Sequence, residues 1–474
     1  MILSWRRWTL SRISWAVLTI CAAATIPAAE TASDPPAIAR PAAASDWPED
    51  RFHVPDSQSR DLIATLLLES PQLRSSWARS QSRMERVPQA RSLPEMQFRY
   101  TYFASTPETR VGPQTQGLEL SQVVPWGGKR RLQAERDESL AVGATWEAAD
   151  LERMLVADLK HAYFEAAYLQ EALEINSEER ELLRRFESIA LKRYSTGEGI
   201  QQSVVKVQTE ISRLDDGRTD LRRRLDAMGR RISELIGRPD APLNLELIDL
   251  SLPEIRHERE NLERIAVSDH PRVHAVEQRV EADLLWTERR EREARPDFRF
   301  ALGYIVVEDR DDPAGVLNPP PDNGQDVLAL SVGIEIPLYR KRIRSGVAEA
   351  RGSQRANEEL LAAVRNRLRY DVQEALLRLD SLHERGRLYR DVIIPQAEES
   401  LASAEAAYTT NRLDFLDLLD AQRILFQSRL AYHRLMSDLW IALADLELAV
   451  GKPVPYVPGT ANSRQRKTTS GSTS

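Results

Sequence analysis

The chain has few or none of several features on which whole classes of protein depend. Cys21 is its only cysteine, so no intramolecular disulfide can form. Lys and Arg (65) are outnumbered by Asp and Glu (72), and the net charge of −7 gives no indication of nucleic-acid binding. After residue 29, no run reaches the roughly 18 apolar residues that a transmembrane helix requires. Glycine (20) and aromatic residues (6%) are also few, whereas Glu, Arg, Leu and Ala are abundant, which is typical of long helices.

Residues 1–29 have the pattern of a secretory signal, in which basic residues precede an apolar run and small residues. We expect cleavage after Ala24 or Ala29. Cys21 is either removed with the signal or lipidated as the N-terminus of a bacterial lipoprotein. An exported chain without a transmembrane helix is expected to be either soluble or a β-barrel.

The rest of the sequence is predicted to be a tandem duplication, because several segments recur in the same order. "YSTG" at Tyr194 and "YTTN" at Tyr408 lie 214 residues apart, and they are followed by "IGRP" and "VGKP" respectively. Similarly, "PWGGKRR" at Pro125 parallels "PLYRKRIRS" at Pro337, 212 residues further on. The offsets drift slowly along the chain, as loop insertions would make them do.

Each half is expected to contain the same elements, joined by a linker at 238–258 and flanked by an extended segment at 30–55 and a disordered tail at 454–474. In the first repeat, 56–237, these are a helical stretch to 91, strands at about 95–104 and 115–124, a long helix at 128–193, a tip at 194–200 and a helix at 201–236. In the second, 259–453, they are a helical stretch to 294, strands at about 297–307 and 326–336, a long helix at 340–407, a tip at 408–413 and a helix at 414–450.

The two long helices exceed the needs of a compact soluble domain, since about 65 residues make a helix of roughly 100 Å. Pro395 is expected to kink or break the second one, because proline removes a backbone donor and clashes with the preceding turn. At the tips, Gly197 and Asn411 occupy matching positions. Both residue types tolerate the positive φ that a reversal between helices needs.

The strand-like segments alternate apolar and polar residues with a period of two. In one of them, Phe298, Phe300 and Leu302 alternate with Arg299 and Ala301. This pattern over about ten residues is typical of transmembrane strands with one face toward lipid and one toward a lumen. The alternative is a pair of hairpins lying on an ordinary core. Four strands cannot close a barrel and lipid excludes open edges, so several chains would have to share one barrel, and three copies supply twelve strands.

No catalytic or metal-binding motif is evident, and we predict no cofactor and no metal site. "PWGGKRR" lacks the spacing of a phosphate-binding loop, so Pro125, Gly127 and Gly128, like Pro337, are expected to turn the chain from strand into helix. The basic residues beside these turns either meet lipid headgroups or form ordinary solvated helix starts. They are Lys129, Arg130 and Arg131 in the first repeat, and Arg340, Lys341 and Arg342 in the second.

With these features, the sequence resembles the outer-membrane factor (TolC) family of Gram-negative bacteria over about residues 56–453. The resemblance rests on the duplicated plan, on "SQVVPWGGKRR", on "ESPQL" and "DHPRV" ahead of the halves, and on the two tips. "PWGGKR" is similar to the branch that serves heavy-metal cation efflux. The family implies an α+β membrane protein, a homotrimer in which each chain contributes four β-strands to a 12-stranded outer-membrane barrel. A long α-helical periplasmic tunnel continues that barrel.

The resemblance also implies a site at the far end of the tunnel. In the family, two aspartates beyond the second tip line the closed periplasmic end. Counted from Tyr408, these are Asp417 and Asp420, and Asp414 is an additional acid nearby. In a trimer, these carboxylates would form a ring that concentrates cations and repels anions.

The first repeat lacks this ring, since it has Ser203 and Lys206 at the corresponding positions. Beside the aspartates, Leu416 and Leu419 are expected to pack against the neighbouring helix. The tips are expected to contact a periplasmic adaptor, although "TGE" and "TNR" depart from the family's usual small apolar residue and glycine. The tip residues are Tyr194, Gly197, Tyr408, Asn411 and Arg412.

The predicted function is that of the exit duct of a tripartite efflux system in the outer membrane of a Gram-negative bacterium, with a large periplasmic part. The duct would export small solutes, either heavy-metal cations or drugs. Its partners would be a periplasmic adaptor, an inner-membrane pump of the resistance–nodulation–division type and outer-membrane lipid, with no nucleic acid. Two alternatives stay open: the exit duct of a type I protein secretion system, and a soluble periplasmic coiled-coil scaffold. An enzyme is not expected.

Overall fold

The computed structural model describes residues 56–197, 199–239, 250, 254–255, 259–410 and 412–457, all within one compact unit, Asp46–Ser474. The predicted signal (1–29), the N-terminal segment (30–55), most of the linker and Asn411 lie outside these residues. So does the tail beyond Val457.

Prolines divide the helical stretch expected at the start of each half. In the first half there are three helices, α2 (Ser57–Glu69), α3 (Pro71–Met84) and α4 (Arg86–Arg91), and in the second half two, α7 (Arg259–Asp269) and α8 (Pro271–Arg292). Ser70 and His270 are non-helical, with ψ of 119° and 134°, because the residue before a proline is biased away from the α region. Proline itself suits the first helical position, where its missing N–H has no intrahelical acceptor.

The long helices differ in continuity. α5 (Lys129–Ser195) runs unbroken for 67 residues, roughly 100 Å at 1.5 Å per residue. Its counterpart consists of α10 (Arg340–Leu388), a π-helical turn over Tyr389–Ile393 and α11 (Ile394–Thr409). The π turn directly precedes Pro395, whose ring and missing N–H cannot be accommodated by a regular α-helix. The interruption expected at this proline is therefore a local widening of the helix.

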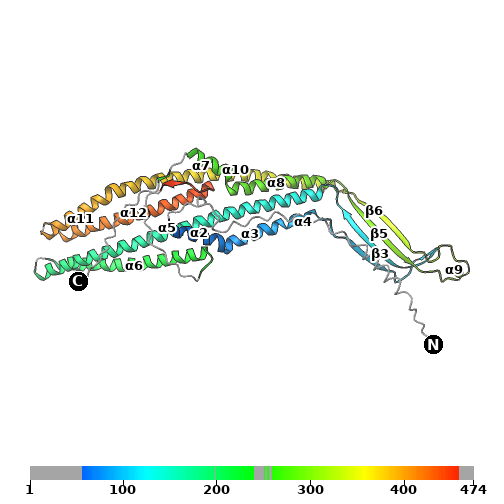
Figure 1. Ribbon diagram of the computed structural model, residues 1–474, viewed down its shortest axis with the longest axis horizontal. Helices are drawn as coiled ribbons and strands as arrows, with labels where there is room; N and C mark the ends of the chain where they lie inside the picture. The colour runs from blue at the N-terminus through cyan, green and yellow to red at the C-terminus, as the bar shows by residue number, and fades with distance from the viewer. Residues whose placement is uncertain are drawn as a thin grey trace, which may run out of the picture. The chain divides into compact units, whose positions relative to one another are not determined.

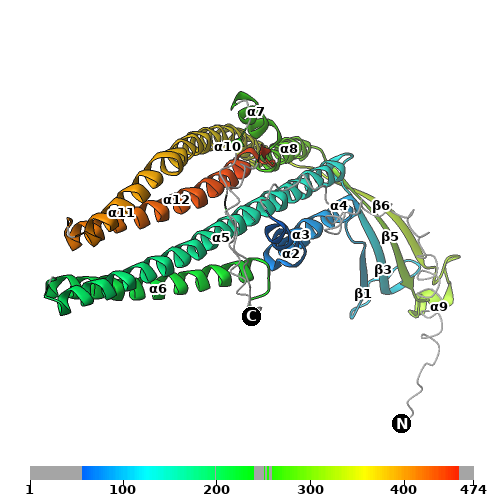
Figure 2. The ribbon, with the colours of Figure 1, turned by 60° about the vertical axis from the view of Figure 1, so that its left-hand side comes forward.

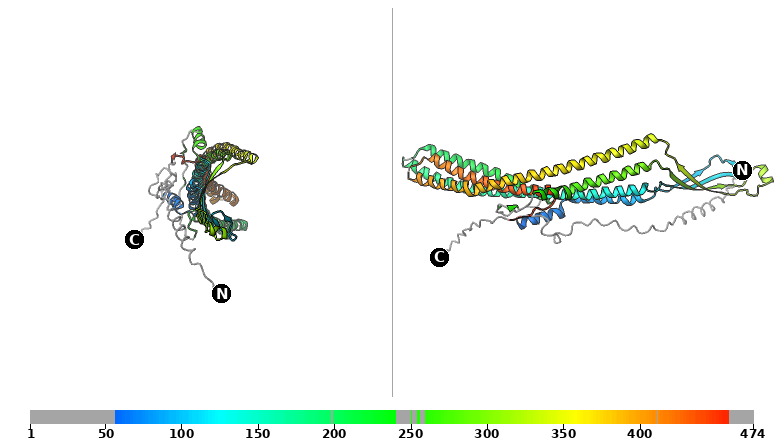
Figure 3. Two further views of the ribbon diagram at one scale, coloured as in Figure 1. Left: turned by 90° about the vertical axis from the view of Figure 1, so that its right-hand side faces the viewer. Right: turned by 90° about the horizontal axis from the view of Figure 1, so that it is seen from above.

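The long helices turn back on themselves at the end away from the strands. α6 (Gln201–Leu235) returns along α5, and α12 (Phe415–Val450) returns along α11 and α10 (Figures 1 and 3). One apolar core joins α2, α5, α7, α10 and α12, with Phe164 and Trp440 in ring contact at 5.4 Å. A second core joins the two hairpins near their turns, where Leu183, Val207 and Leu418 are buried. Many positions in both cores are Ala or Leu, which have high helix propensity.

Four strands at the other end of the helices form an antiparallel sheet (Figure 2). They are β1 (Gln97–Tyr102), β3 (Gly112–Val124), β5 (Asp297–Val307) and β6 (Val327–Glu335), in that order, and a short β2 (Glu108–Thr109) pairs with β3. Phe98, Leu120, Leu302 and Leu330 form one row across the sheet. The adjacent row, Gln97, Ser121, Ala301 and Ser331, is polar or small and points to the other face. The period-two alternation thus gives one apolar face and one polar face.

Several short elements are absent from the sequence-based prediction, among them one helix and one pair of strands. α9 (Pro313–Leu317) lies in the connection between β5 and β6. β4 (Glu254–Ile255) pairs antiparallel with β7 (Tyr456–Val457), in segments predicted to be a linker and a disordered tail. Backbone hydrogen bonds between segments so far apart in the chain leave no local pattern in the sequence. Among the described residues, no helix is both long and apolar enough to cross a membrane.

Candidate functional site

The predicted acidic site lies at the start of α12. Asp414 is the N-cap of this helix, and its carboxylate accepts a hydrogen bond from the N–H of Phe415 at 2.6 Å. A carboxylate at a helix N-terminus also interacts favourably with the helix dipole. Asp414 therefore has a local structural role that distinguishes it from the next two aspartates.

Asp417 and Asp420 are exposed on the surface of α12. Within the described part of the chain, neither carboxylate has a hydrogen-bond or ion-pair partner. The opposite side of the helix is buried through Phe415, Leu418 and Leu419. The prediction that Leu416 packs beside Leu419 is wrong, because Leu416 is 38% exposed and Leu418 takes its place. One side of α12 thus carries two carboxylates that are unpaired within the described chain, and the opposite side of the helix is packed against the protein.

The two tips differ in the exposure of their tyrosines. Tyr194 is 48% exposed, whereas Tyr408 is 5% exposed and contacts the ring of Phe415 at 5.6 Å between centroids. The guanidinium of Arg193 lies 4.5 Å from the centre of the Tyr408 ring, a cation–π geometry. Tyr408 therefore packs the second tip onto the first, and of the two tyrosines only Tyr194 presents a large surface to a partner.

The backbone at the tips follows the expected reversal. Gly197 has φ of 78°, in the left-handed region that glycine adopts without strain. Its equivalent, Asn411, lies outside the described residues. The N–H of Arg412 donates to the carbonyl of Ala407 at 2.9 Å, and the Arg412 side chain is exposed.

Polar contacts beyond the aspartates connect the two hairpins. Gln422 of α12 donates to Glu179 of α5, and Arg423 lies 3.6 Å from Glu210 of α6. Further along, Arg429 lies 3.3 Å from Glu178. Sequence analysis missed these contacts, because each of these residues is an ordinary polar residue on its own helix and only packing brings the pairs together.

Glu179 leads to a pH-dependent prediction. Burial raises the pKa of its carboxyl above the ordinary 4.5, with a smaller opposing effect from the Gln422 hydrogen bond. The folded protein therefore holds this proton more tightly than the unfolded chain, and stability falls as the pH rises above 4.5 through the raised pKa. We expect Glu179→Gln, which keeps an acceptor for Gln422, to raise the unfolding free energy at neutral pH and to leave it unchanged below pH 4.5.

The control for this experiment is Glu178→Gln, at the neighbouring exposed residue that pairs with Arg429. It should change stability little at either pH, because exposed ion pairs contribute about 0–1 kcal/mol. Equal effects of the two substitutions in denaturant titrations would contradict the role assigned to burial of Glu179.

The predicted strand-to-helix turns lie where β3 meets α5 and β6 meets α10. Gly128 is the N-cap of α5 with φ of 90°, which suits glycine, and Pro125 and Gly127 precede it. Asp297, at the base of β5, accepts a hydrogen bond from the N–H of Trp126 at 2.7 Å and another from the ammonium of Lys129 at 2.8 Å. This carboxylate thus joins the first turn to the third long strand.

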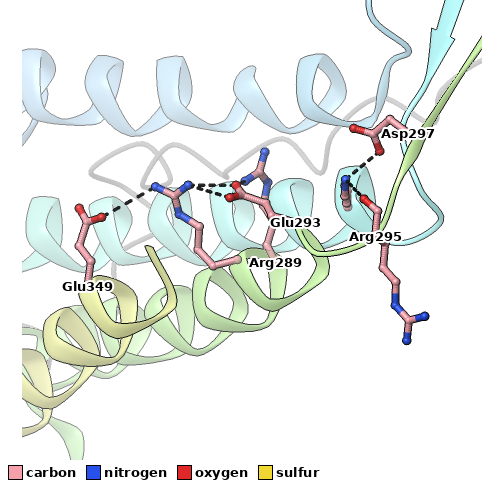
Figure 4. Close-up of polar contacts among 7 residues, drawn as sticks. Arg289, Glu293, Arg295, Asp297 and Glu349 are labelled. Atoms are coloured by element: carbon pink, nitrogen blue, oxygen red, sulfur yellow. Dashed lines mark hydrogen bonds and ion pairs between the residues drawn. The ribbon is translucent and has the colours of Figure 1, made fainter. Parts of the chain in front are cut away.

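An arginine cluster continues this junction into the helices (Figure 4). Glu293 accepts hydrogen bonds from Arg289 and Arg290, at 3.1 and 2.9 Å, and Arg290 lies 4.0 Å from Glu349 of α10. The guanidinium groups of Arg289 and Arg290 also lie 4.9 and 4.5 Å from the centre of the Trp286 ring. Of these contacts, the Arg290–Glu349 ion pair joins α8 to α10, and the others order the arginines at the end of α8.

The described residues contain no group of three or more His, Cys, Asp or Glu side chains that could hold a metal ion. His270, the first of two histidines spaced by four, is instead the N-cap of α8 and accepts a hydrogen bond from the N–H of Arg272 at 3.0 Å. Burial lowers the pKa of its imidazole, in keeping with a neutral capping role.

Comparison with known proteins agrees with this geometry. Residues 320–452, which include β6, α10, α11 and α12, match the family model described as outer membrane efflux protein. With the fold, this match confirms the predicted resemblance to outer-membrane efflux proteins.

Individual relatives support the same conclusion. The cobalt-zinc-cadmium resistance protein CzcC of Cupriavidus metallidurans is 22% identical over 380 residues, which cover 77% of this chain and 83% of CzcC. The structure of CusC is similar with a TM-score of 0.71 at 16% identity, covering 88% of this chain and 99% of that one. The open-state outer membrane channel MtrE of Neisseria gonorrhoeae has a TM-score of 0.69 at 17% identity, covering 86% and 95%. At these identities, the solved structures establish the fold alone.

Proposed function

We propose that three copies of this chain form the outer-membrane exit duct of a tripartite efflux system. Each copy contributes four strands to a 12-stranded barrel, and the helices of all three continue it as a periplasmic tunnel. A periplasmic adaptor and an inner-membrane pump of the resistance–nodulation–division type deliver the cargo. The observation that carries the proposal is the sheet, which has one exposed apolar face and two unpaired edges.

The apolar face of the sheet is suited to lipid. Large side chains on this face are exposed on every long strand except β3. They include Phe98, Tyr100, Phe300, Leu302, Leu328 and Leu330. The other face has charged residues, with Arg99 3.7 Å from Glu119. Apolar residues outward and polar residues inward are the pattern of a strand between lipid and an aqueous lumen.

The two sheet edges support assembly. Of the long strands in the described chain, β1 and β6 each pair with one neighbour only. Their free N–H and C=O groups cannot remain unpaired in a bilayer, so β6 of one copy is expected to pair with β1 of the next. Exposed apolar residues on α10 extend the same edge into the helices. Tyr370, Leu377 and Leu388 are spaced by 7 and 11 residues, which places them on one stripe.

A tandem duplication accounts for the order of the elements. In both halves, two long strands are followed by a long helix and then, after a short turn, by a returning helix. The recurring tip segments and the PWGGKRR and PLYRKRIRS segments lie at the same points of the two halves. Because each of the three copies contains two similar halves, the helices of the duct would have approximately sixfold symmetry. The acidic tip, which is the second one, would occur once in each copy.

The proposed cargo is a heavy-metal cation, for which the similarity to a cobalt-zinc-cadmium resistance protein is the main support. Deleting the gene should increase sensitivity to these cations, and restoring it should reverse the effect. Unchanged sensitivity would count against a metal cargo while leaving the duct itself in place. A heat-labile trimer in outer-membrane fractions is the test of the duct, and recovery of the mature protein as a soluble monomer would overturn it.

A pair of adjacent substitutions tests the orientation of the sheet. Leu330→Arg places a charge on the apolar face, where it should cost about 2–4 kcal/mol near the middle of the bilayer. Ser331→Arg places the same charge on the polar face and should be tolerated. We expect the amount of trimer in outer-membrane fractions to fall for the first variant only, and the reverse order would contradict the assignment of the two faces.

A further inference from the structure

The two basic segments beside the strand-to-helix turns, alike in sequence, have different environments. At the start of α5, every cation has a partner within the chain. Lys129 contacts Asp297, Arg130 donates to the carbonyl of Arg91 at 2.7 Å, and Arg131 contacts Glu135 at 2.8 Å. Lys129 and Arg130 thus join α5 to neighbouring segments, and the charge of Arg131 is paired within its own helix.

At the start of α10, the corresponding cations are in a different environment. Arg340, Lys341, Arg342 and Arg344 are all exposed. Among the residues that the structure describes, no side chain of the four has a hydrogen bond or an ion pair. Four unpaired positive charges within five residues repel one another, so an anion at this surface would relieve an unfavourable interaction.

Three of the four cations share one side of the helix. Ile343 is buried and faces the protein. At about 100° per residue, Arg340, Lys341 and Arg344 fall within about 100° of each other on one flank, and Arg342 falls on the opposite flank. A single anionic group can therefore be reached by three of these side chains but not by the fourth.

The hydrogen bonds of the sheet determine which flank faces outward. The carbonyl of Ala301, whose side chain is on the polar face, accepts from the Ser331 hydroxyl of β6 at 3.5 Å. Consider the sheet viewed from its apolar face, with β5 running upward. For L-residues, the direction of the Ala301 carbonyl then places β6 to the left of β5. Because α8 leads into β5 and α10 follows β6, α10 lies to the left of α8. Ile343 lies on the side of α10 that faces α8, because its position around the helix falls between those of Glu349 and Arg351, which contact Arg290 and Glu291 of α8. From Ile343, the right-handed turn of the descending helix then brings Arg344 to the side of the apolar face.

An exposed apolar segment separates these cations from β6. Ile336, Leu338 and Tyr339 follow the strand directly, and Leu338 and Tyr339 are 76% and 78% exposed. Aromatic and aliphatic side chains followed by basic residues are typical of the boundary between the hydrocarbon and the headgroups of a bilayer. The order along the chain matches that boundary: apolar strand, aromatic residue, then three cations on one flank.

We propose that Arg340, Lys341 and Arg344 bind the phosphate of an anionic phospholipid in the periplasmic leaflet of the outer membrane. Guanidinium groups suit phosphate because they donate two parallel hydrogen bonds, and the lysine adds a compact charge. Leu338 and Tyr339 contact the upper part of the acyl chains. The site depends on the proposed outer-membrane duct, since only that orientation brings these residues to the headgroup level.

The test measures lipid binding to the purified full-length trimer. Native mass spectrometry of the detergent-solubilised protein, titrated with phosphatidylglycerol or phosphatidylcholine, should show preferential binding of the anionic lipid. In the triple variant Arg340→Gln, Lys341→Gln and Arg344→Gln, this affinity should fall about a hundredfold, from the loss of three basic groups near a headgroup. Arg342→Gln, on the opposite flank, is the control within the same turn and should bind like the wild type.

A second control removes the same number of positive charges as the triple variant, but at positions further along α10. It replaces by glutamine the exposed residues Arg355, Arg369 and Arg385. Retained binding in this control, with loss in the triple variant and an intact trimer in both, supports the site. Undiminished anionic-lipid binding by the triple variant overturns it, as does displacement of the lipid by millimolar inorganic phosphate, which would indicate a free-phosphate site.

Two further outcomes also overturn the lipid site and show where the error lies. Loss of the trimer in the triple variant alone would indicate that these residues pair with a second copy of the chain. A wild-type protein that forms no trimer in outer-membrane fractions would instead refute the proposed duct, on which the lipid site rests.

Discussion

Replacing both Asp417 and Asp420 by alanine is expected to lower the cation selectivity of the reconstituted channel about tenfold, at the low end of the range for charge focusing in a narrow passage. The two residues are exposed, and no ion pair within the described part of the chain neutralises them. In the proposed trimer they supply six carboxylates around one axis. Such a ring attracts cations and repels anions in proportion to its charge. Reversal potentials in planar bilayers under a salt gradient provide the measurement.

Two variants separate charge from other effects. The double substitution Asp417→Asn with Asp420→Asn keeps the size of the side chains and should lose selectivity to the same extent. Asp414→Ala should leave selectivity unchanged, because this carboxylate caps α12, and should reduce stability by about 1 kcal/mol. If selectivity is retained in both double variants, the carboxylates do not form the constriction.

The largest loss of stability is expected from Lys160→Met. Lys160 of α5 and Glu447 of α12 form an ion pair, and their side chains are 5% and 11% exposed. Removing the lysine leaves a buried carboxylate without its counter-charge, which costs about 3–5 kcal/mol. Among the described residues, the Glu447 carboxylate then keeps a 3.3 Å hydrogen bond from the N–H of Val454, which cannot compensate for the lost charge. Denaturant titration of the detergent-solubilised protein should show the loss.

The matched double variant, Lys160→Met with Glu447→Leu, should recover most of this stability, because two apolar side chains in contact leave no buried charge. Arg231→Met, at an exposed pair with Glu234, should change the unfolding free energy by no more than about 1 kcal/mol. A double variant as unstable as Lys160→Met alone would show that the loss arises from packing and not from the unpaired charge.

The sequence was sufficient for features that depend on local stereochemistry. Prolines at 71, 271 and 395 divide or widen helices where they stand, because a missing N–H and a fixed φ act within one turn. Alternation in β5 and β6 determines the two faces of the sheet, since successive side chains of a strand point to opposite sides. Gly197 adopts the positive φ expected of the tip. The predicted site at Asp417 and Asp420 rests on residues that the family resemblance identified without coordinates.

Only the tertiary structure could distinguish residues with similar local sequence. Tyr194 and Tyr408 begin matching tips, yet Phe415 and Arg193 cover only the second. The basic segments at the starts of α5 and α10 are alike, but Asp297 binds Lys129, and the α10 cations lack a comparable partner among the described residues. Local propensity is the same in each pair, whereas burial and charge pairing depend on segments brought together from elsewhere in the chain. The sequence therefore determined the elements and their faces, and packing decided which equivalent residues support the structure and which remain available to a ligand or a partner.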